Sequence, residues 1–247
     1  MGHYQVSLRD GQRVGTMFNY HPAPTGLNAR TNLYYVETRD LGKTWTNVRG
    51  EAVSAPLTQV QNPALVHDFQ AEKLLVYLKD LQYDAGGHPV LLYLTSKGYE
   101  PGPQNDPRTY YTARWTGALW EMRGMATTDH NYDFGSLYVE ADGTWRVIAT
   151  SDPGPQPWGT GGEVVMWTSR DRGATWRSKK LTSGSCRNQN YPRRPVNAHP
   201  DFYALWADGN PLVLSESSLY FTNREGTGVW KLPTVMTHAA EKPQKIR

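Results

Sequence analysis

The sequence predicts an all-β protein made of about four sets of four short antiparallel strands, the arrangement of blades in a β-propeller. Strand-like runs recur at short intervals, and turn sequences such as RDGQ, ADGT and NREGTG separate them. The composition agrees, with 23 Gly, 17 Pro, 9 Trp and 15 Tyr among 247 residues, whereas helical periodicity is almost absent. Because one all-β domain commonly has this length, we expect residues 1–247 to be a single propeller domain or part of one.

The predicted blades follow one another along the chain. The first, residues 3–50, has strands at 4–8, 13–20, 32–38 and 44–48. The second, 63–123, has strands at 64–69, 74–79 and 90–95 and a last one within 111–122. Its Pro- and Gly-rich insertion at 95–111 is too long for a hairpin turn. The third, 136–182, has strands at 136–140, 144–149, 163–169 and 175–181. The fourth, 202–233, has strands at 202–206, 211–215, 218–222 and 228–232.

One octet occurs twice, as TRDLGKTW at 38–45 and SRDRGATW at 169–176, each time after the third predicted strand of its set. Asp40 and Asp171 can accept hydrogen bonds from backbone amides of a tight turn. The glycine two residues later supplies the positive φ that a residue with a Cβ resists. Thr and Trp then suit a returning strand. We interpret both octets as structural turns without a catalytic role.

The octets match the Asp-box, or BNR, repeat of sialidase-like β-propellers. The stretches NLYYVETRDLGKTW, GGEVVMWTSRDRGATW and NYPRRPVNAHPDFYALWADG resemble the BNR-4 group of that superfamily, so the resemblance covers nearly the whole chain. Members include glycoside hydrolases and polysaccharide lyases, typically with six or seven blades. The resemblance therefore implies the later part of a larger propeller, with a compact smaller propeller as the alternative. It also implies a bacterial protein that is secreted or periplasmic in its full-length form, although MGHYQVSL contains no signal peptide.

Several classes of partner are not expected from the composition. The formal charge is +3, from 26 Lys and Arg against 23 Asp and Glu, and the basic residues are too scattered for a nucleic-acid binder. No apolar run approaches the ~20 residues of a membrane helix. Cys186 stands alone, and the histidines lack metal-ligand spacing. GTGGE at 159–163 lacks the Lys-Ser/Thr of a phosphate loop. We expect no metal and no cofactor, and the oligomeric state stays open.

The expected partner is a poly- or oligosaccharide. Sialic acid cleavage is disfavoured because the early Arg-Ile-Pro motif of sialidases is absent, and the YPRRP stretch at 191–195 lies near the opposite end. The resemblance suggests instead a uronate-containing polysaccharide, cleaved by a lyase or a glycoside hydrolase. The alternative is a non-catalytic glycan-binding propeller or an incomplete fragment of such an enzyme. A lyase needs a cation for the carboxylate, a base for the C5 proton and an acid for the departing oxygen.

Three residues are candidates for the acid and base roles. His21 ends a strand and enters a loop, where the alternative is a turn histidine exposed to solvent. His130 lies in the polar loop TTDHNYDFG just before the first strand of a blade, a position that borders the central channel of a propeller. Tyr191 lies two residues before a pair of arginines. We therefore assign catalytic roles to His21, His130 and Tyr191.

The substrate-binding candidates are Arg193, Arg194 and His199, in the connection between the third and fourth predicted blades. The planar guanidinium matches a carboxylate, whereas the alternative is an arginine paired with Glu163 or Glu216. Hydrolysis would instead need two carboxylates on either side of the bond. The candidates for that role are Asp68, Asp80, Asp133 and Glu163.

Overall fold

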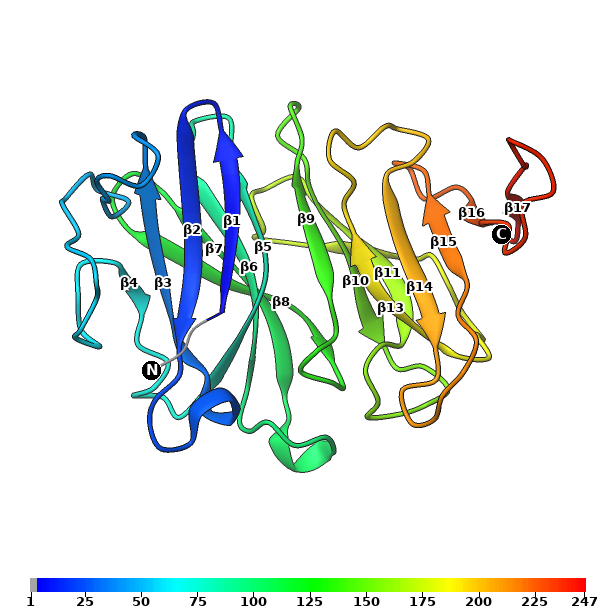
Figure 1. Ribbon diagram of the computed structural model, residues 1–247, viewed down its shortest axis with the longest axis horizontal. Coiled ribbons are helices and arrows are strands. Elements are labelled where there is room, and N and C mark those ends of the chain that lie inside the picture. The colour runs from blue at the N-terminus through cyan, green and yellow to red at the C-terminus, as the bar shows by residue number, and fades with distance from the viewer. Residues whose placement is uncertain (1–3) are drawn as a thin grey trace. The chain divides into compact units, whose positions relative to one another are not determined.

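The computed structural model describes residues 4–247, and the regular secondary structure in that range is almost entirely β-strand (Figure 1). It contains four antiparallel sheets and two short 3-10 helices, η1 (Gly26–Ala29) and η2 (Pro103–Asn105), with no α-helix in the described part of the chain. The all-β prediction is therefore confirmed. Residue 3, the first of the predicted blade 3–50, lies outside the described residues.

The chain divides into two compact units, each with two sheets whose strands follow chain order. The first unit comprises Met1–Glu100, Gln104–Ala126 and Ala141–Gly143, and the second comprises Pro101–Pro103, Thr127–Glu140 and Thr144–Arg247. The first sheet contains β1 (Gln5–Asp10), β2 (Arg13–Tyr20), β3 (Thr31–Thr38) and β4 (Leu65–His67). The second contains β5 (Leu75–Tyr83), β6 (Pro89–Ser96), β7 (Arg108–Trp115) and β8 (Trp120–Thr128). The third contains β9 (Gly135–Val139), β10 (Trp145–Asp152), β11 (Glu163–Ser169) and β12 (Arg177–Lys180). The fourth contains β13 (Asn188–Arg193), β14 (Ala204–Gly209), β15 (Leu219–Thr222), β16 (Val229–Lys231) and β17 (Gln244–Lys245).

The core of the first unit is made by one face of the first sheet against one face of the second. Met17 of β2 and Leu33 and Tyr35 of β3 pack with Leu91 and Tyr93 of β6, and all are fully or almost fully buried. These positions alternate along their strands, because successive side chains of a strand point to opposite faces. The other face of β2 and β3 is therefore left for a different environment.

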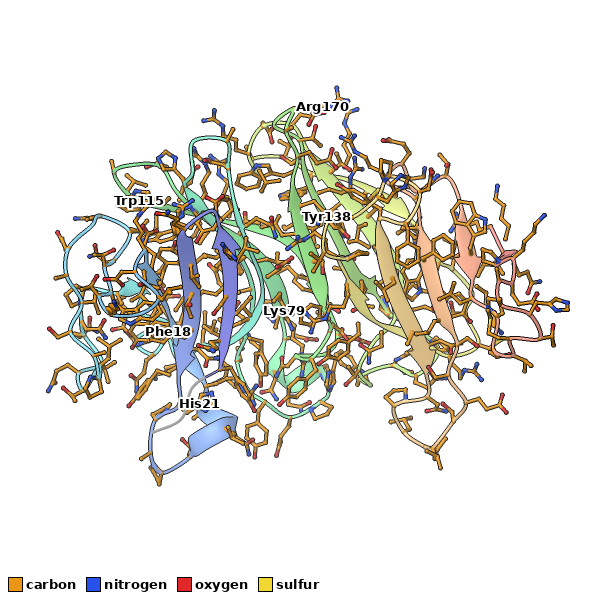
Figure 2. All side chains as sticks on the ribbon, turned by 45° about the horizontal axis from the view of Figure 1, so that its top comes forward. Phe18, His21, Lys79, Trp115, Tyr138 and Arg170 are labelled. Carbon is orange, nitrogen blue, oxygen red and sulfur yellow. The ribbon has the colours of Figure 1, made fainter. Side chains whose placement is uncertain are left out.

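The second unit is built in the same way from the third and fourth sheets. Tyr138 of β9, labelled in Figure 2, stacks on Tyr203 with ring centroids 4.4 Å apart, and its hydroxyl donates to the Tyr203 carbonyl oxygen. Trp206 of β14 is buried and donates from Nε1 to the Gln189 side-chain oxygen at 2.8 Å. The polar ends of these aromatic side chains are thus satisfied within the core.

A buried ion network joins the ends of these two sheets. Glu140, which follows β9, accepts hydrogen bonds from Arg146 of β10 at 2.9 Å, from Arg224 after β15 and from the Tyr203 hydroxyl at 2.8 Å. Burial alone would raise the pKa of Glu140, but the hydrogen bonds from Arg224, Arg146 and Tyr203 outweigh it and lower this pKa. Glu140 therefore stays ionised as a structural group.

Both octets form the turn that the sequence predicts, and each follows the third strand of its sheet. The Asp40 carboxylate accepts from the Thr44 N–H at 2.9 Å and the Thr44 hydroxyl at 2.7 Å, and the Thr38 hydroxyl donates to it at 2.8 Å. Asp171 makes the matching bonds with Thr175 and Ser169. Gly42 and Gly173 have φ values of 85° and 82°. The structural interpretation of the octet geometry is confirmed.

The predicted strand at 44–48 is wrong, although the rest of the first sheet agrees with the prediction. Thr46 makes only isolated bridges with Glu37 and Ala52. The reason is a turn, in which the Asn47 side chain accepts from the Arg49 and Glu51 N–H groups and ends the pairing. The fourth strand is instead β4, which lies within the predicted strand 64–69 and pairs with β3.

Two further predicted strands differ from those in the structure. The strand expected within 111–122 divides into β7 and β8 around Gly117, which has a φ of 97°. The predicted strand 211–215 is wrong, because the Asn210 side chain caps the Leu212 N–H in an exposed turn. The fourth sheet begins instead with β13, in the segment expected to be a connection. The third sheet agrees with its four predicted strands. That the whole chain is one propeller domain or part of one stays a prediction.

We expect Asp40→Ala and Asp171→Ala each to lower the melting temperature, because the donors of the turn lose their acceptor. Any turnover by the folded fraction should be unchanged. Calorimetry and an activity assay on the same samples check this. Lost turnover in a fully folded variant would contradict the structural role of the octets.

Acid should weaken both octet turns. Hydrogen bonds from the Thr44 N–H and hydroxyl lower the pKa of Asp40 from 3.8 to about 2, and those from the Thr175 hydroxyl and N–H do the same for Asp171. Because the folded pKa lies below the unfolded one, this stability is fully present above about pH 4 and is lost as the pH falls toward 2. Urea unfolding across this range should show a shallower pH dependence in an Asp40→Asn, Asp171→Asn double variant than in the parent. Equal slopes would contradict the assignment.

Candidate active site in the second unit

The buried carboxylate of Asp133 fixes the loop that carries His130. Asp133 is 0% exposed and accepts from the Gly161 N–H at 2.6 Å, the His130 N–H at 3.1 Å and the Thr128 hydroxyl. These donors belong to the end of β8, to the loop before β9 and to the segment between β10 and β11. One side chain therefore holds three segments in place. Asp133 is a structural anchor and is not available as one of a catalytic pair of carboxylates.

The ring of His130 is held in one orientation. Its Nδ1 accepts from the Tyr132 N–H at 3.1 Å and lies 3.2 Å from the Thr160 hydroxyl oxygen, and the residue is only 9% exposed. Because a nitrogen that accepts a backbone N–H carries no proton, the neutral ring has its proton on Nε2. The Tyr132 ring lies 5.8 Å from that of His130. His130 is thus a positioned imidazole with Nε2 as its donor.

Tyr191 lies at an irregular position of β13 that leaves its side chain partly exposed. The register with β14 shifts between Asn190 and Arg193, and Tyr191 has a φ of 58°, which residues with a Cβ rarely adopt. Its N–H donates to the Asn190 side chain at 2.8 Å. The side chain is 47% exposed and stacks on Phe134, with centroids 5.1 Å apart and an angle of 5° between the rings. A rare backbone conformation that presents a tyrosine is typical of functional positions.

Arg193 joins the same stack. Its guanidinium carbon lies 3.8 Å from the Phe134 ring centroid and 5.1 Å from that of Tyr191. Stacking on an aromatic ring holds the flat face of the group and leaves its in-plane N–H groups suited to a carboxylate. The structure therefore brings Tyr191 and Arg193 together on Phe134, which belongs to the loop of His130.

The other predicted residues of this unit lie elsewhere. The Arg194 N–H donates to the Ser136 hydroxyl at 3.1 Å, and its guanidinium carbon lies 5.9 Å from the Tyr138 ring centroid, beside β9. His199 is exposed in a turn, where its Nδ1 accepts from the Asp201 N–H at 3.2 Å. Neither contact belongs to the stack on Phe134. Their assignment to substrate binding stays a prediction.

His21 belongs to the first unit, where Figure 2 shows it at the end of β2. It is 2% exposed, so the alternative of a turn histidine exposed to solvent is wrong. Its ring meets the edge of Tyr4 with centroids 5.0 Å apart, and the Arg30 guanidinium carbon lies 4.6 Å from the centroid of the same tyrosine ring. His21 is therefore packed in an aromatic and basic environment, and its catalytic assignment stays a prediction.

The carboxylates considered for hydrolysis are engaged within their own units. In the first unit, Asp68 accepts from Gln61 at 2.6 Å, and Asp80 accepts from the Leu81 N–H at 2.9 Å. In the second, Glu163 accepts from the N–H and the hydroxyl of Ser185, both at 2.8 Å. Glu163 lines a polar hollow of about 520 Å3 together with Asp152, which pairs with Lys180 at 2.7 Å. These contacts fit structural roles.

Phe134 and Thr160 were not identified from the sequence. Phe134 follows His130 and Tyr132 at intervals of two residues, and this repeated spacing of rings could have marked it. In the structure the segment is a turn, where the Asp133 N–H donates to the His130 carbonyl oxygen at 3.2 Å. Nothing local marks Thr160, because its contact with His130 spans 30 residues.

No group of three or more His, Cys, Asp and Glu side chains among residues 4–247 is arranged to hold a metal ion. No helix in this range is long and apolar enough to span a membrane.

Solved structures similar to this chain include carbohydrate-active enzymes and a protein of unknown function. An ulvan lyase from a new family of polysaccharide lyases has a TM-score of 0.70 and 18% identity, covering 90% of this chain and 51% of its own. It has also been solved bound to -[GlcA(1-4)Rha3S]-. A protein of unknown function from Dyadobacter fermentans has a TM-score of 0.57 and 14% identity, covering 92% and 62%. A xylan β-1,4-xylosidase from Bacillus halodurans has a TM-score of 0.53 and 14% identity, covering 94% and 42%.

These similarities show the fold, which is a β-propeller of antiparallel blades as the sequence predicts, with four strands in the first three sheets and five in the fourth. The chain spans about half the length of the ulvan lyase that it matches. No curated protein matches it in sequence. The sequence model for BNR repeat-containing family members matches residues 4–128, which is half of the chain. The chain therefore belongs to the BNR repeat-containing family.

Proposed function

We propose that this chain is carbohydrate-active and cleaves a uronate-containing polysaccharide by β-elimination at His130, Tyr191 and Arg193. The observation that carries the proposal is the stack of Tyr191 and Arg193 on Phe134. The stack places a guanidinium beside an exposed phenol. Both groups lie against Phe134, which belongs to the loop that also holds the oriented imidazole of His130. A cation, a base and an acid are the three groups that elimination next to a carboxylate requires.

Each group has its own role in the proposed reaction. Arg193 pairs with the uronate carboxylate and stabilises the negative charge that develops as the C5 proton leaves. The Tyr191 hydroxyl oxygen, beside Arg193, accepts that proton as it passes its own proton to the departing oxygen. The C4–O bond breaks in the same step while a C4=C5 double bond forms, and the Nε2–H of His130 donates a hydrogen bond to the departing oxygen. The Nδ1 contact with the Tyr132 N–H supports this division, because it makes Nε2 the donor.

The similarity to an ulvan lyase solved with a glucuronate-containing ligand supports an acidic sugar as the substrate. Because this chain spans about half of that lyase, activity of the whole protein is part of the proposal. Hydrolysis is less well supported, since Asp133 and Glu163 are occupied by backbone and hydroxyl donors. A glycan-binding propeller without turnover is the second candidate, favoured by the exposed aromatic surface of Tyr191.

Three finer assignments accompany this function. The octets at 38–45 and 169–176 are proposed as Asp-boxes, on the support of their identical hydrogen-bond pattern. The chain is proposed to belong to a bacterial protein of the sialidase-like type. A secreted or periplasmic location fits, because a polysaccharide substrate is met outside the cytoplasm.

The assay separates the candidate functions. The chain is incubated with polygalacturonate, alginate and glucuronan, while ultraviolet absorbance follows the new double bond and a separate assay counts reducing ends. Absorbance that rises with reducing ends supports the lyase. Reducing ends without absorbance identify a hydrolase, and binding without either product identifies a glycan-binding protein. The last two results contradict the proposal.

We expect Arg193→Lys to keep its charge but to weaken uronate binding about tenfold or more, because the planar fork is lost. Tyr191→Phe and His130→Ala should abolish formation of the double bond while binding persists. Arg177→Lys, at an exposed position of β12, is the matched control and should resemble the parent. Binding is measured by titration calorimetry, and melting temperatures check the fold. An Arg193→Lys variant that binds like the parent would remove this stack from the site.

A further inference from the structure

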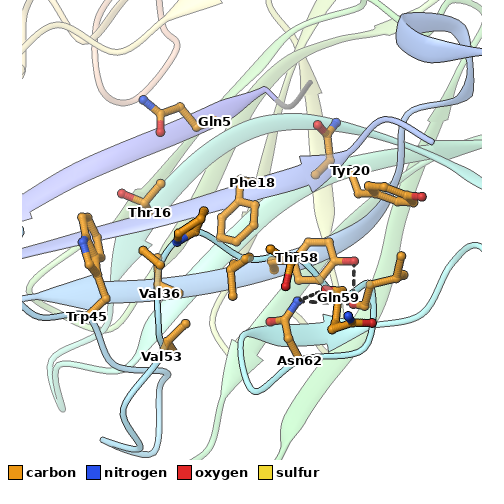
Figure 3. A pocket seen from close by; sticks show the side chains of 16 residues that line it. Gln5, Thr16, Phe18, Tyr20, Val36, Trp45, Val53, Thr58, Gln59 and Asn62 are labelled. Atoms are coloured by element: carbon orange, nitrogen blue, oxygen red, sulfur yellow. Dashed lines mark hydrogen bonds between the residues drawn. The ribbon is translucent and has the colours of Figure 1, made fainter. Parts of the chain in front are cut away.

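The first unit contains a pocket that the proposed reaction does not use. It has a volume of about 420 Å3, within the range of small-molecule sites, and is lined by residues between Gln5 and Asn62 (Figure 3). Its floor is the face of β2 and β3 that points away from the core, with Phe18 stacked on Tyr34 at 5.0 Å. Trp45 and Leu57 contribute to its wall.

This face is not built like the sheet faces that other sheets cover in this protein. In the core of the first unit, apolar side chains from neighbouring strands form a continuous surface. On the pocket face, β1 instead presents Gln5, Ser7 and Arg9, which are all exposed and lie opposite Phe18, Thr16 and Val14 of β2. A sheet packed here would bury this polar strip, at a cost in desolvation. The pocket is therefore an aromatic hollow with a polar, solvent-exposed edge along β1.

The pocket lining combines aromatic surface with neutral polar groups. Phe18, Tyr20 and Trp45 are partly exposed, whereas Gln5, Thr58 and Gln59 are exposed at the pocket. None of the lining residues is charged. The Tyr34 hydroxyl already donates to the Val60 carbonyl oxygen at 3.0 Å, so Tyr34 is a fixed part of the floor. The lining therefore offers hydrogen-bond donors and acceptors but no cation to pair with an anion.

We infer that this pocket binds a neutral sugar residue of a polysaccharide, at a site separate from the proposed uronate site. A pyranose ring has an apolar C–H face and a rim of hydroxyl groups. The C–H face matches the partly exposed ring of Phe18, and the hydroxyls match the side chains of Gln5 and Gln59, which can both donate and accept. The inference rests on the proposed function in one respect, namely that the ligand is a carbohydrate.

The test uses xylohexaose, cellohexaose and mannohexaose as neutral probes, with titration calorimetry and saturation-transfer NMR on the whole chain. At least one probe should bind the parent, and Phe18→Ala should weaken that binding about tenfold. Gln59→Ala removes an exposed side chain and keeps the test valid if Phe18→Ala fails to fold. The matched control is Tyr99→Ala, an exposed tyrosine of the first unit outside the pocket, which should bind like the parent.

Each outcome separates this inference from the proposed cleavage. Neutral-sugar binding that depends on Phe18 but survives Arg193→Lys supports the inference, even if no uronate is cleaved. Absence of binding by all three probes overturns it, even if uronate cleavage is found. Binding that neither pocket variant changes also overturns it. So does a change in sedimentation coefficient on Phe18→Ala with unaltered sugar binding, which would identify a protein interface.

Discussion

Within each unit, two antiparallel sheets bury one face of each against the other, and this packing determines which side chains remain for a ligand. Tyr35 and Tyr93 in the first unit, and Tyr138 and Trp206 in the second, are buried in these interfaces. In β2, for example, side chains alternate between the two faces, so Met17 lies in the core and Phe18 lines the pocket. Ligand-binding chemistry is therefore confined to strand ends, loops and outer faces.

The proposed uronate site occupies strand ends and loops, where backbone groups lack partners in a sheet. Asp133 supplies that missing acceptor for Gly161 and His130, and so stabilises the segments that carry His130, Phe134 and Thr160. The positive φ of Tyr191 is unfavourable in free energy, and it occurs where β13 departs from its regular pairing with β14. Stability in the surrounding sheets thus permits a rare conformation at the site.

The two proposed sugar-binding surfaces differ in their electrostatics. The stack on Phe134 includes a guanidinium, which suits a carboxylate. The hollow at Phe18 has no charged lining residue and suits an uncharged ring. A polysaccharide that contains both acidic and neutral residues presents both kinds of chemistry. The two proposed sites therefore differ in the kind of sugar residue that each would bind.

The sequence by itself determined the all-β class, the third sheet and both octet turns. These features depend on interactions within a few residues, such as Asp40 with Thr44, and on alternation along one strand. The predicted strands were wrong where a side chain forms a local turn, as at Asn47 and Asn210. The prediction also missed β13, a polar segment that becomes a strand only because it pairs with β14. Predicting those elements requires knowledge of the partner strand.

The candidate site was predictable only in part. The sequence marks His130, Tyr191 and Arg193 by their chemistry, namely a titratable ring, a phenol and a guanidinium next to prolines. The tertiary structure decided which of them meet, because Phe134 and Tyr191 are 57 residues apart and touch only when β9 and β13 are in place. It also separated Arg193 from Arg194, which the sequence could not distinguish. Arg193 is the last residue of β13 and pairs with Leu205 of β14, whereas Arg194 lies just beyond the strand, so only the pairing with β14 decides which of them joins the stack.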